Sequence, residues 1–456
     1  MELRWSPTLS CSDIESGQWR ALCALLRRLP DNPFWSARLR AAGIEDPGAI
    51  GSLSDFIDSV PLLEKSEIAA DQRARPPWGS NYTGDPRTAV RLHQTSSTSG
   101  KVPLQWLDSP ESWAWVVENW ATVLDAAEIR AGDPVFFAFS FGPFLGFWAG
   151  WDAAVHRGCR ALSGGAQGTR ARLESILSQR AVAVCATPTY ALRLGEMARE
   201  EGIDLQAGAV RALVVAGEPG GCVPSIRSRL EELWPGATVF DHYGMTEVGP
   251  VTLQVAAEPT RVYPIESSYL CELIDSDDGR RLEVGTDAVE GELVLTTLGR
   301  SASPLLRYRT GDRVRAVRRP LPGGELGSMA FEGGILDRAD DMVIVRGVNL
   351  YPRAVDEQVR AVEGVAEYRV EIAEERDMAE VDLLFEAVDP AQAPNVGRQL
   401  AESLRSAFPL RIQVLAVAGG TLPRFELKAR RWIRVRSPED RIERSVLPDP
   451  GEVDSP

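Results

Sequence analysis

The chain of 456 residues contains few of the side chains that bind transition metals. It has three histidines, and its six cysteines are scattered without a CxxC pair, so we expect free thiols in a cytoplasmic protein and no zinc site. No apolar run reaches the roughly 18 residues of a membrane span, and the first residues lack the apolar segment of a signal peptide. The formal net charge of −15 argues against nucleic acid and anionic membranes as main partners.

The content of 44% hydrophobic and 25% charged residues is ordinary for a folded protein of this length, for which we expect two or three domains. Between residues 111 and 240, short apolar runs alternate with helical stretches, which predicts a mostly parallel sheet covered on both faces. Residues 252–330 alternate between turns, with Asp277-Asp278-Gly279 as a hairpin turn, which predicts an antiparallel, barrel-like region.

These patterns predict an α/β fold with two domains. Residues 1–339 form the large N-terminal domain, and its β-rich subdomain covers residues 252–336. Residues 340–436 form a small C-terminal α+β domain, and residues 437–456 have the Pro, Asp and Glu content of a disordered tail.

The stretch DHYGMTE, residues 241–247, follows an apolar run that has the pattern of a strand. Its residue types suit a nucleotide and its metal: Tyr243 offers a flat face, Gly244 allows close approach to the backbone, Thr246 offers a hydroxyl to a phosphate, and Glu247 offers hard oxygens to Mg²⁺. The stretch AGEP, residues 216–219, also follows a strand. Loops at the carboxyl ends of parallel strands share one edge, where such sheets bind ligands. An ordinary polar loop would have a similar composition.

Three further stretches support a nucleotide site. Residues 95–101, TSSTSGK, form a hydroxyl-rich loop whose N–H and hydroxyl groups suit a triphosphate, although the spacing is not that of a Walker loop. In RYRTGD, residues 307–312, Asp312 stands at a glycine turn and suits a ribose diol. In LPRFELK, residues 422–428, Lys428 lies in a loop near the C-terminus.

In their order along the chain, the motifs resemble those of the adenylate-forming superfamily of acyl-CoA synthetases, adenylation domains and luciferases, and within it those of the phenylacetate–CoA ligase family. The resemblance rests on RLHQTSSTSGK (residues 91–101), AGEP, YGMTE (residues 243–247), RYRTGD and RADDMVIVRGVN (residues 338–349), and it extends over roughly residues 30 to 435. The sequence departs from the family pattern at Ser97, Val102, Asp337 and Leu427. None of these departures removes a charge that the chemistry needs.

The resemblance implies a role for each motif. Lys428, Thr246 and Glu247 would be catalytic, and Glu247 would also bind Mg²⁺. The ATP or AMP site would comprise Ser96, Ser97, Thr98, Ser99, Gly100, Lys101, Gly217, Glu218, Pro219, Asp241, His242, Tyr243, Gly244, Asp312 and Arg338. The small domain would be mobile, turning about a hinge at Asp340 and bringing Arg346 and Gly347 to the side of the site where CoA binds.

Aromatic residues follow the first strand of the parallel sheet, where the family keeps its acid pocket. Rings suit an aromatic acid, and a serine among them suits a ring hydroxyl or amino group. The expected pocket comprises Phe139, Ser140, Phe141, Phe144, Gly217, Tyr243 and Gly244. Some of these phenylalanines would serve equally well as core residues.

By this resemblance the protein is an ATP-dependent ligase that activates an aryl or arylalkyl carboxylic acid as acyl-AMP and transfers it to CoA. The motifs describe adenylation only, so a carrier-protein thiol, an amine or another nitrogen nucleophile stays open as the acceptor. A non-catalytic nucleotide-binding protein is the third alternative, and the joint presence of Glu247, Asp312 and Lys428 argues against it. Members of the family often dimerise, so a homodimer is possible.

Overall fold

A computed structural model describes residues 9–95, 103–338, 343–345, 348–375, 378–408, 410, 412–425 and 429–435. The chain divides into two compact units, Met1–Leu336 and Asp337–Pro456, which are described separately below. The predicted domain boundary after residue 339 and the predicted disordered tail fall outside the described residues and stay predictions. In the described part of the chain, no helix is long and apolar enough to cross a membrane.

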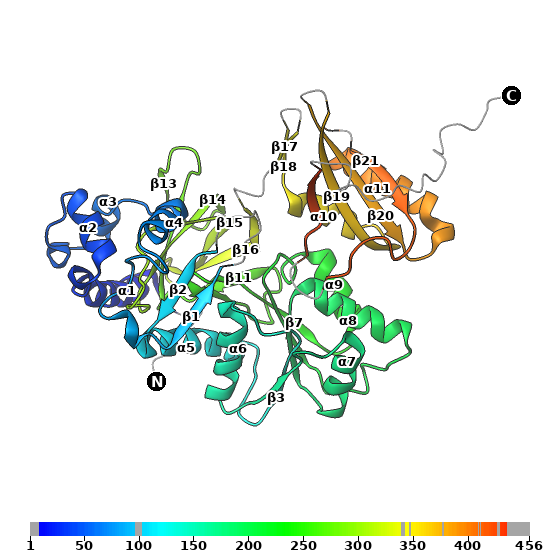
Figure 1. The fold of residues 1–456 in the computed structure, drawn as a ribbon, viewed down its shortest axis with the longest axis horizontal. Helices are drawn as coiled ribbons and strands as arrows, with labels where there is room; N and C mark the ends of the chain where they lie inside the picture. The colour runs from blue at the N-terminus through cyan, green and yellow to red at the C-terminus, as the bar shows by residue number, and fades with distance from the viewer. Residues whose placement is uncertain are drawn as a thin grey trace. The chain divides into compact units, whose positions relative to one another are not determined.

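The first unit contains a five-stranded parallel sheet in the order β4-β3-β5-β6-β7, as predicted. The strands are β3 (Pro134–Phe137), β4 (Arg160–Ser163), β5 (Ala183–Ala186), β6 (Ala212–Ala216) and β7 (Thr238–His242). Helix α5 (Pro110–Ala126) precedes these strands, and the helices between them are α6 (Leu145–His156), α7 (Thr169–Ser178), α8 (Pro188–Glu200) and α9 (Pro224–Leu233) (Figure 1).

Helices cover both faces of this sheet because successive strand residues point to opposite sides. Phe137 and Val214 pack in one cluster of buried side chains with α5 and α6. Phe136 and Leu213 pack in a second cluster with α7, α8 and α9. Two apolar layers therefore hold the strands in place, and the loops at their carboxyl ends leave from a fixed edge.

A seven-stranded sheet, in the order β10-β11-β16-β15-β14-β12-β13, forms the predicted antiparallel part of this unit. Its strands are β10 (Thr252–Leu253), β11 (Arg261–Pro264), β12 (Tyr269–Ile274), β13 (Arg281–Leu282), β14 (Val289–Thr297), β15 (Tyr308–Pro320) and β16 (Leu326–Arg338). The predicted hairpin turn at Asp277-Asp278-Gly279 joins β12 to β13, and Gly279 takes a φ of +71° there.

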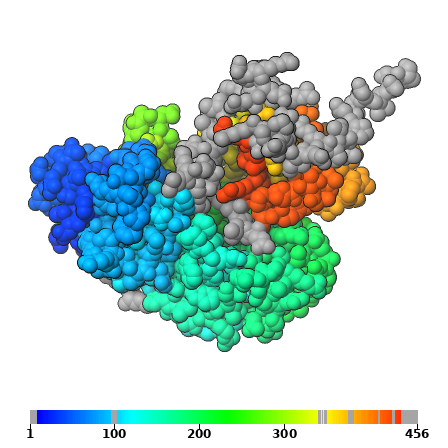
Figure 2. Space-filling view, viewed as in Figure 1, coloured from blue at the N-terminus to red at the C-terminus, as the bar shows by residue number. Residues whose placement is uncertain are grey.

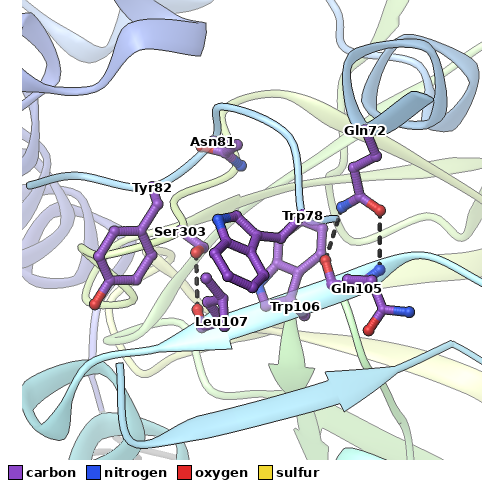
Figure 3. A pocket seen from close by; sticks show the side chains of 8 residues that line it. All are labelled: Gln72, Trp78, Asn81, Tyr82, Gln105, Trp106, Leu107 and Ser303. Atoms are coloured by element: carbon purple, nitrogen blue, oxygen red, sulfur yellow. Dashed lines mark hydrogen bonds between the residues drawn. The ribbon is translucent and has the colours of Figure 1, made fainter. Parts of the chain in front are cut away.

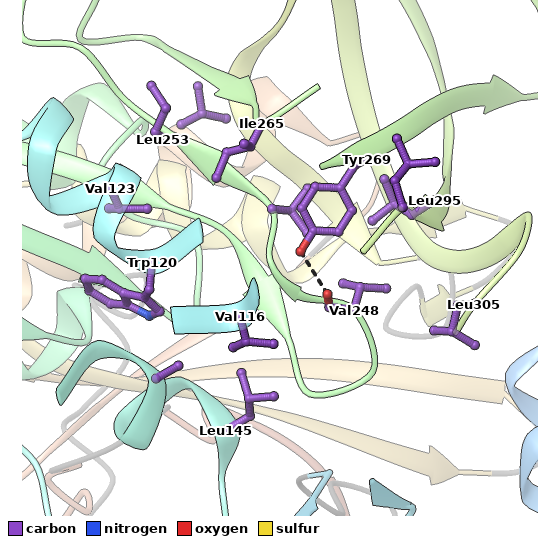
Figure 4. Close-up of a cluster of buried hydrophobic side chains, with 14 of the residues drawn as sticks. Val116, Trp120, Val123, Leu145, Val248, Leu253, Ile265, Tyr269, Leu295 and Leu305 are labelled. Atoms are coloured by element: carbon purple, nitrogen blue, oxygen red, sulfur yellow. Dashed lines mark hydrogen bonds between the residues drawn. The ribbon is translucent and has the colours of Figure 1, made fainter. Parts of the chain in front are cut away.

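The core shown in Figure 4 joins the two sheets. Val116 and Trp120 of α5 meet Leu253, Ile265 and Leu295 of the antiparallel region. Val248 lies in the same cluster, and the hydroxyl of Tyr269 donates to its carbonyl at 2.8 Å. The residue directly after Glu247 is therefore fixed in the core.

The helices α1 (Cys11–Leu26), α2 (Pro33–Ala41), α3 (Leu53–Ser59) and α4 (Lys65–Ala74) precede α5 in the chain. They pack on the same core through buried residues such as Leu22, Trp35, Phe56 and Ile68. Figures 1 and 2 show these helices, in blue, beside the hairpin of β1 (Arg91–Gln94) and β2 (Gln105–Asp108). That hairpin flanks the expected phosphate loop.

The second unit is the α+β fold that the sequence predicts. Its four-stranded sheet has the order β21-β20-β19-β22, with strands β19 (Val365–Glu375), β20 (Met378–Ala387), β21 (Gln413–Val417) and β22 (Trp432–Val435). Helices α10 (Pro352–Arg360) and α11 (Ala393–Ala407) share its core, and β17 (Val343–Val345) pairs with β18 (Val348–Leu350).

Candidate active site

The two predicted nucleotide loops leave the parallel sheet side by side. Strands β6 and β7 are neighbours, with Ala216 opposite His242 in the register. The loops that begin at Gly217 and Tyr243 therefore start at the same edge, as expected from the strand pattern. Gly217 has a φ of +95°, a conformation that favours glycine, so the chain turns sharply as it leaves the strand.

The two carboxylates expected around adenine accept hydrogen bonds from main-chain N–H groups. Glu218 accepts a hydrogen bond from the N–H of Thr189 at 2.8 Å, and Asp241 accepts one from the N–H of Cys222 at 2.7 Å. A Cβ on Gly221 would lie 2.7 Å from the Cβ of Asp241, so the chain passes close to β7. These contacts hold the loop against the sheet.

Tyr243 and Asp312, which belong to separate motifs, meet in the structure. The Tyr243 hydroxyl donates to a carboxylate oxygen of Asp312 at 2.5 Å, although 69 positions separate them in the chain. Asp312 is almost fully buried, and its N–H donates to the hydroxyl of Thr310 at 3.0 Å. One hydrogen bond thus links the expected adenine residue to the expected ribose residue.

The backbone around position 244 requires a glycine there, for a reason that the sequence did not reveal. The strands β8 (Gly244–Met245) and β9 (Gly249–Pro250) pair closely. A Cβ on Gly244 would lie 2.7 Å from the carbonyl oxygen of Gly249, which is closer than real Cβ atoms approach. That a ligand approaches the backbone of Gly244 stays a prediction. The close contact between β8 and β9 requires a glycine there in any case.

Thr246 and Glu247 lie beside the hairpin that carries the expected phosphate loop. The Thr246 hydroxyl donates to the carbonyl of Gln94, the last residue of β1, at 3.3 Å. The Glu247 carboxylate is buried and forms an ion pair with Lys65 Nζ, which lies 2.9 Å from Oε1. In the described part of the chain, Glu247 Oε1 accepts no well-aligned hydrogen bond.

The carboxylate of Glu247 has the chemistry of a Mg²⁺ ligand in a nucleotide site. Such sites supply one or two carboxylates, and the phosphates and water complete the coordination. Among the described residues, no group of three or more His, Cys, Asp and Glu is arranged to hold a metal by itself. A buried carboxylate paired with a single ammonium group therefore fits a nucleotide-borne Mg²⁺ better than a metal bound by protein ligands alone.

Arg300 holds the main chain of this loop. Its Nε and Nη2 donate to the two carboxylate oxygens of Asp108 at 2.7 and 2.6 Å, and both side chains are fully buried. Its Nη1 donates to the carbonyls of Thr246 and Glu247 at 2.7 and 2.8 Å. Because Asp108 ends β2, this one guanidinium connects the hairpin of the phosphate loop to the loop of Glu247.

His242 does not lie where its place in the motif suggests. Its side chain is buried against the ring of Trp120, and Nδ1 lies 2.7 Å from the carbonyl oxygen of Thr252. Burial lowers the pKa of His242 to about 4, so the ring is neutral at physiological pH. The side chain belongs to the core, and only the main chain of His242 reaches the strand edge.

The expected acid pocket contains a cluster of aromatic rings. Phe139 stacks on Phe147 with centroids 4.3 Å apart, Phe141 contacts Phe139 at 5.5 Å, and Phe144 contacts Phe147 at 5.8 Å. Ser140 is exposed, and its hydroxyl lies 3.4 Å from a guanidinium nitrogen of the buried Arg172. The rings come from the end of β3 and from the start of α6.

A separate cavity lies beside β2, lined by Gln72, Trp78, Asn81, Tyr82, Gln105, Trp106, Leu107 and Ser303 (Figure 3). Its volume of about 10 Å³ has room for roughly one water molecule, so it is not the acid pocket. The Gln72 amide bonds both main-chain groups of Gln105, donating to the carbonyl at 2.7 Å and accepting from the N–H at 2.9 Å. Helix α4 is therefore attached to the hairpin of the phosphate loop.

Family models match both units: an AMP-binding enzyme model covers residues 111–299, and an AMP-binding enzyme C-terminal domain model covers residues 347–436. A phenylacetate–coenzyme A ligase of Thermus thermophilus is 31% identical, covering 78% of each chain. One from Pseudomonas putida is 29% identical, covering 92% of this chain and 94% of the relative.

The chain belongs to the adenylate-forming superfamily. A solved 2-hydroxyisobutyryl-CoA ligase, in the postadenylation state in complex with R3-HIB-AMP, superposes with a TM-score of 0.85 at 26% identity and covers 94% of this chain and 91% of the other. The protein is an ATP-dependent, AMP-forming acid–CoA ligase, with ATP and CoA among its substrates.

Several predicted residues of this ligase lie outside the described residues. They are Ser96, Ser97, Thr98, Ser99, Gly100, Lys101, Asp340, Arg346, Gly347 and Lys428. Main-chain contacts close the base of the phosphate loop, where the N–H of Thr95 donates to the carbonyl of Leu104 at 3.0 Å. Arg338 is half-buried at the end of β16.

The loop that leads toward Lys428 is anchored within the second unit. The buried Glu386 accepts hydrogen bonds from the N–H groups of Gly420 and Leu422 and from Arg424. Burial alone would raise the pKa of Glu386, but these hydrogen bonds hold it below its usual value, so the carboxylate is charged at neutral pH. The chain is thus fixed as far as Arg424, four residues before Lys428.

Sequence reasoning missed Arg300 and Lys65. Arg300 stands alone in the sequence, 192 positions from Asp108, so no local pattern marks the pair. Lys65 follows Pro61-Leu62-Leu63-Glu64, a stretch that resembles the family's approach to the phosphate loop, and this was the only available signal.

We expect replacement of Arg300 by Met to destabilise the ligase by about 3–5 kcal/mol, because Asp108 would be left charged and buried. The free energy of unfolding, measured with urea, tests this. Arg28→Met is the matched control: its partner Glu111 is exposed, so the same change should cost only about 0–1 kcal/mol. Adding Asp108→Asn to Arg300→Met should recover part of the loss. Equal losses for Arg300→Met and Arg28→Met would contradict the assignment.

We expect the ligase to lose stability as the pH falls from 6.5 toward 4, partly through His242. The unfolded chain binds a proton near the ordinary pKa of 6.5, whereas the folded ring binds it only near 4, so the unfolded state holds more protons between these values. Between these pH values, the unfolding free energy of the His242→Asn variant should fall less steeply with falling pH than that of the wild type. The difference in slope should be about 1.4 kcal/mol per pH unit. Urea unfolding at pH 6.5, 5.5 and 4.5 measures the slope. Above pH 7.5 the unfolding free energies of the two proteins should depend on pH in parallel. If the variant has the same slope as the wild type below pH 6.5, the prediction is refuted.

Proposed function

We propose that this ligase activates an aromatic carboxylic acid, aryl or arylalkyl, as acyl-AMP with release of pyrophosphate, and then forms its CoA thioester. The cluster of Phe139, Phe141, Phe144 and Phe147 at the end of β3 carries the proposal, because stacked and edge-on rings favour a flat aromatic group. The relatives from Thermus thermophilus and Pseudomonas putida, both named phenylacetate–coenzyme A ligases, support the same choice.

In the first step, a carboxylate oxygen of the acid attacks the α-phosphorus of ATP. The new O–P bond forms as the bond to the β-phosphate breaks, and pyrophosphate leaves. In the second step, the sulfur of CoA attacks the acyl carbon, the thiol proton is released to the surroundings, and AMP leaves. Both steps depend on alignment and charge neutralisation more than on acid–base catalysis.

The residues of the first unit would position ATP for this attack. Residues 96–101 would hold the β- and γ-phosphates, and the Thr246 hydroxyl would bind near the α-phosphate. Asp312, oriented by Tyr243, would hold the ribose hydroxyls. Gly217, Glu218, Pro219 and Asp241 would frame adenine.

Glu247 would hold Mg²⁺, and its buried carboxylate supports this role. A bound Mg²⁺ supplies positive charge to the phosphate oxygens of ATP and of the departing pyrophosphate. The structure contributes the fixed orientation of Glu247, which follows from the Arg300 hydrogen bonds to the main chain and from the burial of Val248.

Lys428 of the second unit would bind the acid carboxylate and the α-phosphate oxygens during adenylation. Asp340 would act as the hinge that lets this unit turn, after which Arg346 and Gly347 would guide the thiol of CoA. Arg338, just before the hinge, would contact the nucleotide. A homodimer likewise stays a prediction.

A small aliphatic hydroxy acid is the second candidate substrate. It is favoured by the likeness to the 2-hydroxyisobutyryl-CoA ligase, which extends over 94% of the chain. The exposed Ser140 beside Arg172 would suit a hydroxyl group in either kind of acid. A panel of acids separates the two candidates directly.

We expect purified protein with ATP and Mg²⁺ to release pyrophosphate with a benzoic, cinnamic or phenylacetic acid, and CoA to convert the adenylate into a thioester. Lys428→Ala should lower the adenylation rate by about 10²-fold or more, since it removes a charge used in the transition state. It should change thioester formation from a supplied acyl-adenylate much less. Activity with 2-hydroxyisobutyrate alone would refute the aromatic proposal, and an adenylate that CoA does not consume would point to a carrier-protein thiol or an amine as acceptor.

We expect Phe144→Ala to raise KM for the best aromatic acid by about tenfold, because it removes a ring worth about 1–2 kcal/mol of contact. Initial rates at saturating ATP and CoA measure this. Phe34→Ala is the matched control: Phe34 is also half-buried, but it packs on Trp35 in α2, so KM should stay unchanged. An unchanged KM in Phe144→Ala would remove this ring from the acid pocket.

A further inference from the structure

Lys65 gives the buried carboxylate of Glu247 its positive partner. Its Nζ lies 2.9 Å from Glu247 Oε1. The Glu247 side chain is 3% exposed and that of Lys65 is 47% exposed, so the ammonium meets the carboxylate from the solvent side. Because Oε1 accepts no well-aligned hydrogen bond from the described residues, this contact is one of charge more than of direction.

The main chain before Lys65 is fixed to the strand that carries Asp312. The N–H of Leu63 donates to the carbonyl of Arg307, and the carbonyl of Leu63 accepts from the N–H of Arg309, both at 2.9 Å. Glu64 forms an ion pair with Arg309 at 2.9 Å and caps the start of α4. The position of the Lys65 backbone is therefore set by the site itself.

The stability of the helix does not explain a lysine at this place. Lys65 is the first residue of α4, where the positive end of the helix dipole disfavours a cation and favours Asp or Glu. At the other end of α4, Gln72 bonds the main chain of Gln105, beside the expected phosphate loop. The helix thus places a cation beside the carboxylate of Glu247, and the neighbouring Thr246 contacts Gln94 at the base of the expected phosphate loop.

We propose that Lys65 is the counter-cation of Glu247 in the nucleotide-free ligase, that it gives up this place to Mg²⁺ when ATP binds, and that its ammonium then binds a phosphate oxygen. The inference rests on the proposed nucleotide site but not on the identity of the acid. A lysine suits both roles, because its charge sits on a flexible four-carbon stem with donors that rotate freely. A carboxylate this deeply buried needs a cation in both states.

The proposal predicts that loss of the Lys65 charge changes the affinity for a metal ion and the affinity for MgATP in opposite directions. In Lys65→Met, nothing competes for Glu247, so Mn²⁺ without nucleotide should bind about tenfold more tightly, as measured by the loss of the free-ion electron paramagnetic resonance signal. MgATP without acid should bind about tenfold more weakly in calorimetry, because a phosphate partner is gone. A purely structural ion pair would not produce this opposition.

Three variants serve as controls. Arg73→Gln removes one positive charge from an exposed position on the same helix and should leave both affinities at wild-type values. Lys65→Arg keeps the charge and should keep Mn²⁺ binding weak. Glu247→Gln added to Lys65→Met should abolish the gain in Mn²⁺ affinity, and far-ultraviolet circular dichroism verifies that each variant is folded.

Unchanged Mn²⁺ affinity in Lys65→Met, or a loss of both affinities together, would overturn the role of Lys65. The proposed function fails separately, because neither binding measurement contains an acid. If the opposite shifts are found but no aromatic acid releases pyrophosphate, the role of Lys65 stands and the choice of substrate is wrong.

Discussion

The buried ion pair of Arg300 and Asp108 is the interaction on which the nucleotide side of this structure depends. The guanidinium uses three nitrogens on four oxygens: two of the Asp108 carboxylate and the carbonyls of Thr246 and Glu247. A buried pair of this kind contributes little net stability when compared with well-packed apolar residues. Its contribution is geometric, because a planar fork with fixed donor directions sets the distance between the hairpin of the phosphate loop and the loop of Glu247.

Several charged groups of the first unit have partners within the protein. Glu247 pairs with Lys65, Asp312 accepts from Tyr243, and Asp241 accepts from Cys222. Preorganised charges need little rearrangement when the transition state develops its own charge. The Glu247 contact differs from the other two because the side chain of Lys65 is half-exposed, which suits the proposed exchange of this cation for Mg²⁺.

The sequence predicted the parallel sheet and the shared edge of its loops because both follow from local patterns. Apolar runs of strand length alternate with helical stretches, and the carboxyl ends of neighbouring parallel strands meet at one edge of the sheet, where Ala216 lies opposite His242. The directions of individual side chains were harder to predict from the sequence. His242 stands in a motif of ligand-binding residues, yet its ring packs on Trp120, because the alternation along β7 points it into the core.

Long-range pairs account for most of what the sequence could not show. Arg300 and Asp108 are 192 positions apart, and nothing in either neighbourhood marks them as partners. Gly244 illustrates the same limit, because the backbone crossing that excludes a Cβ involves Gly249, and the pairing of β8 with β9 is too short to leave an apolar pattern. Motifs identify the kind of chemistry, whereas the packing of distant segments decides which atoms face the ligand.

The second unit applies the same principle to its lysine loop. Glu386 of β20 gathers two main-chain N–H groups and the guanidinium of Arg424 around one buried carboxylate, so the loop is held where it leaves β21. A main chain held as far as Arg424 suits the role proposed for Lys428, since rigid elements position a charge more precisely than a long free loop does.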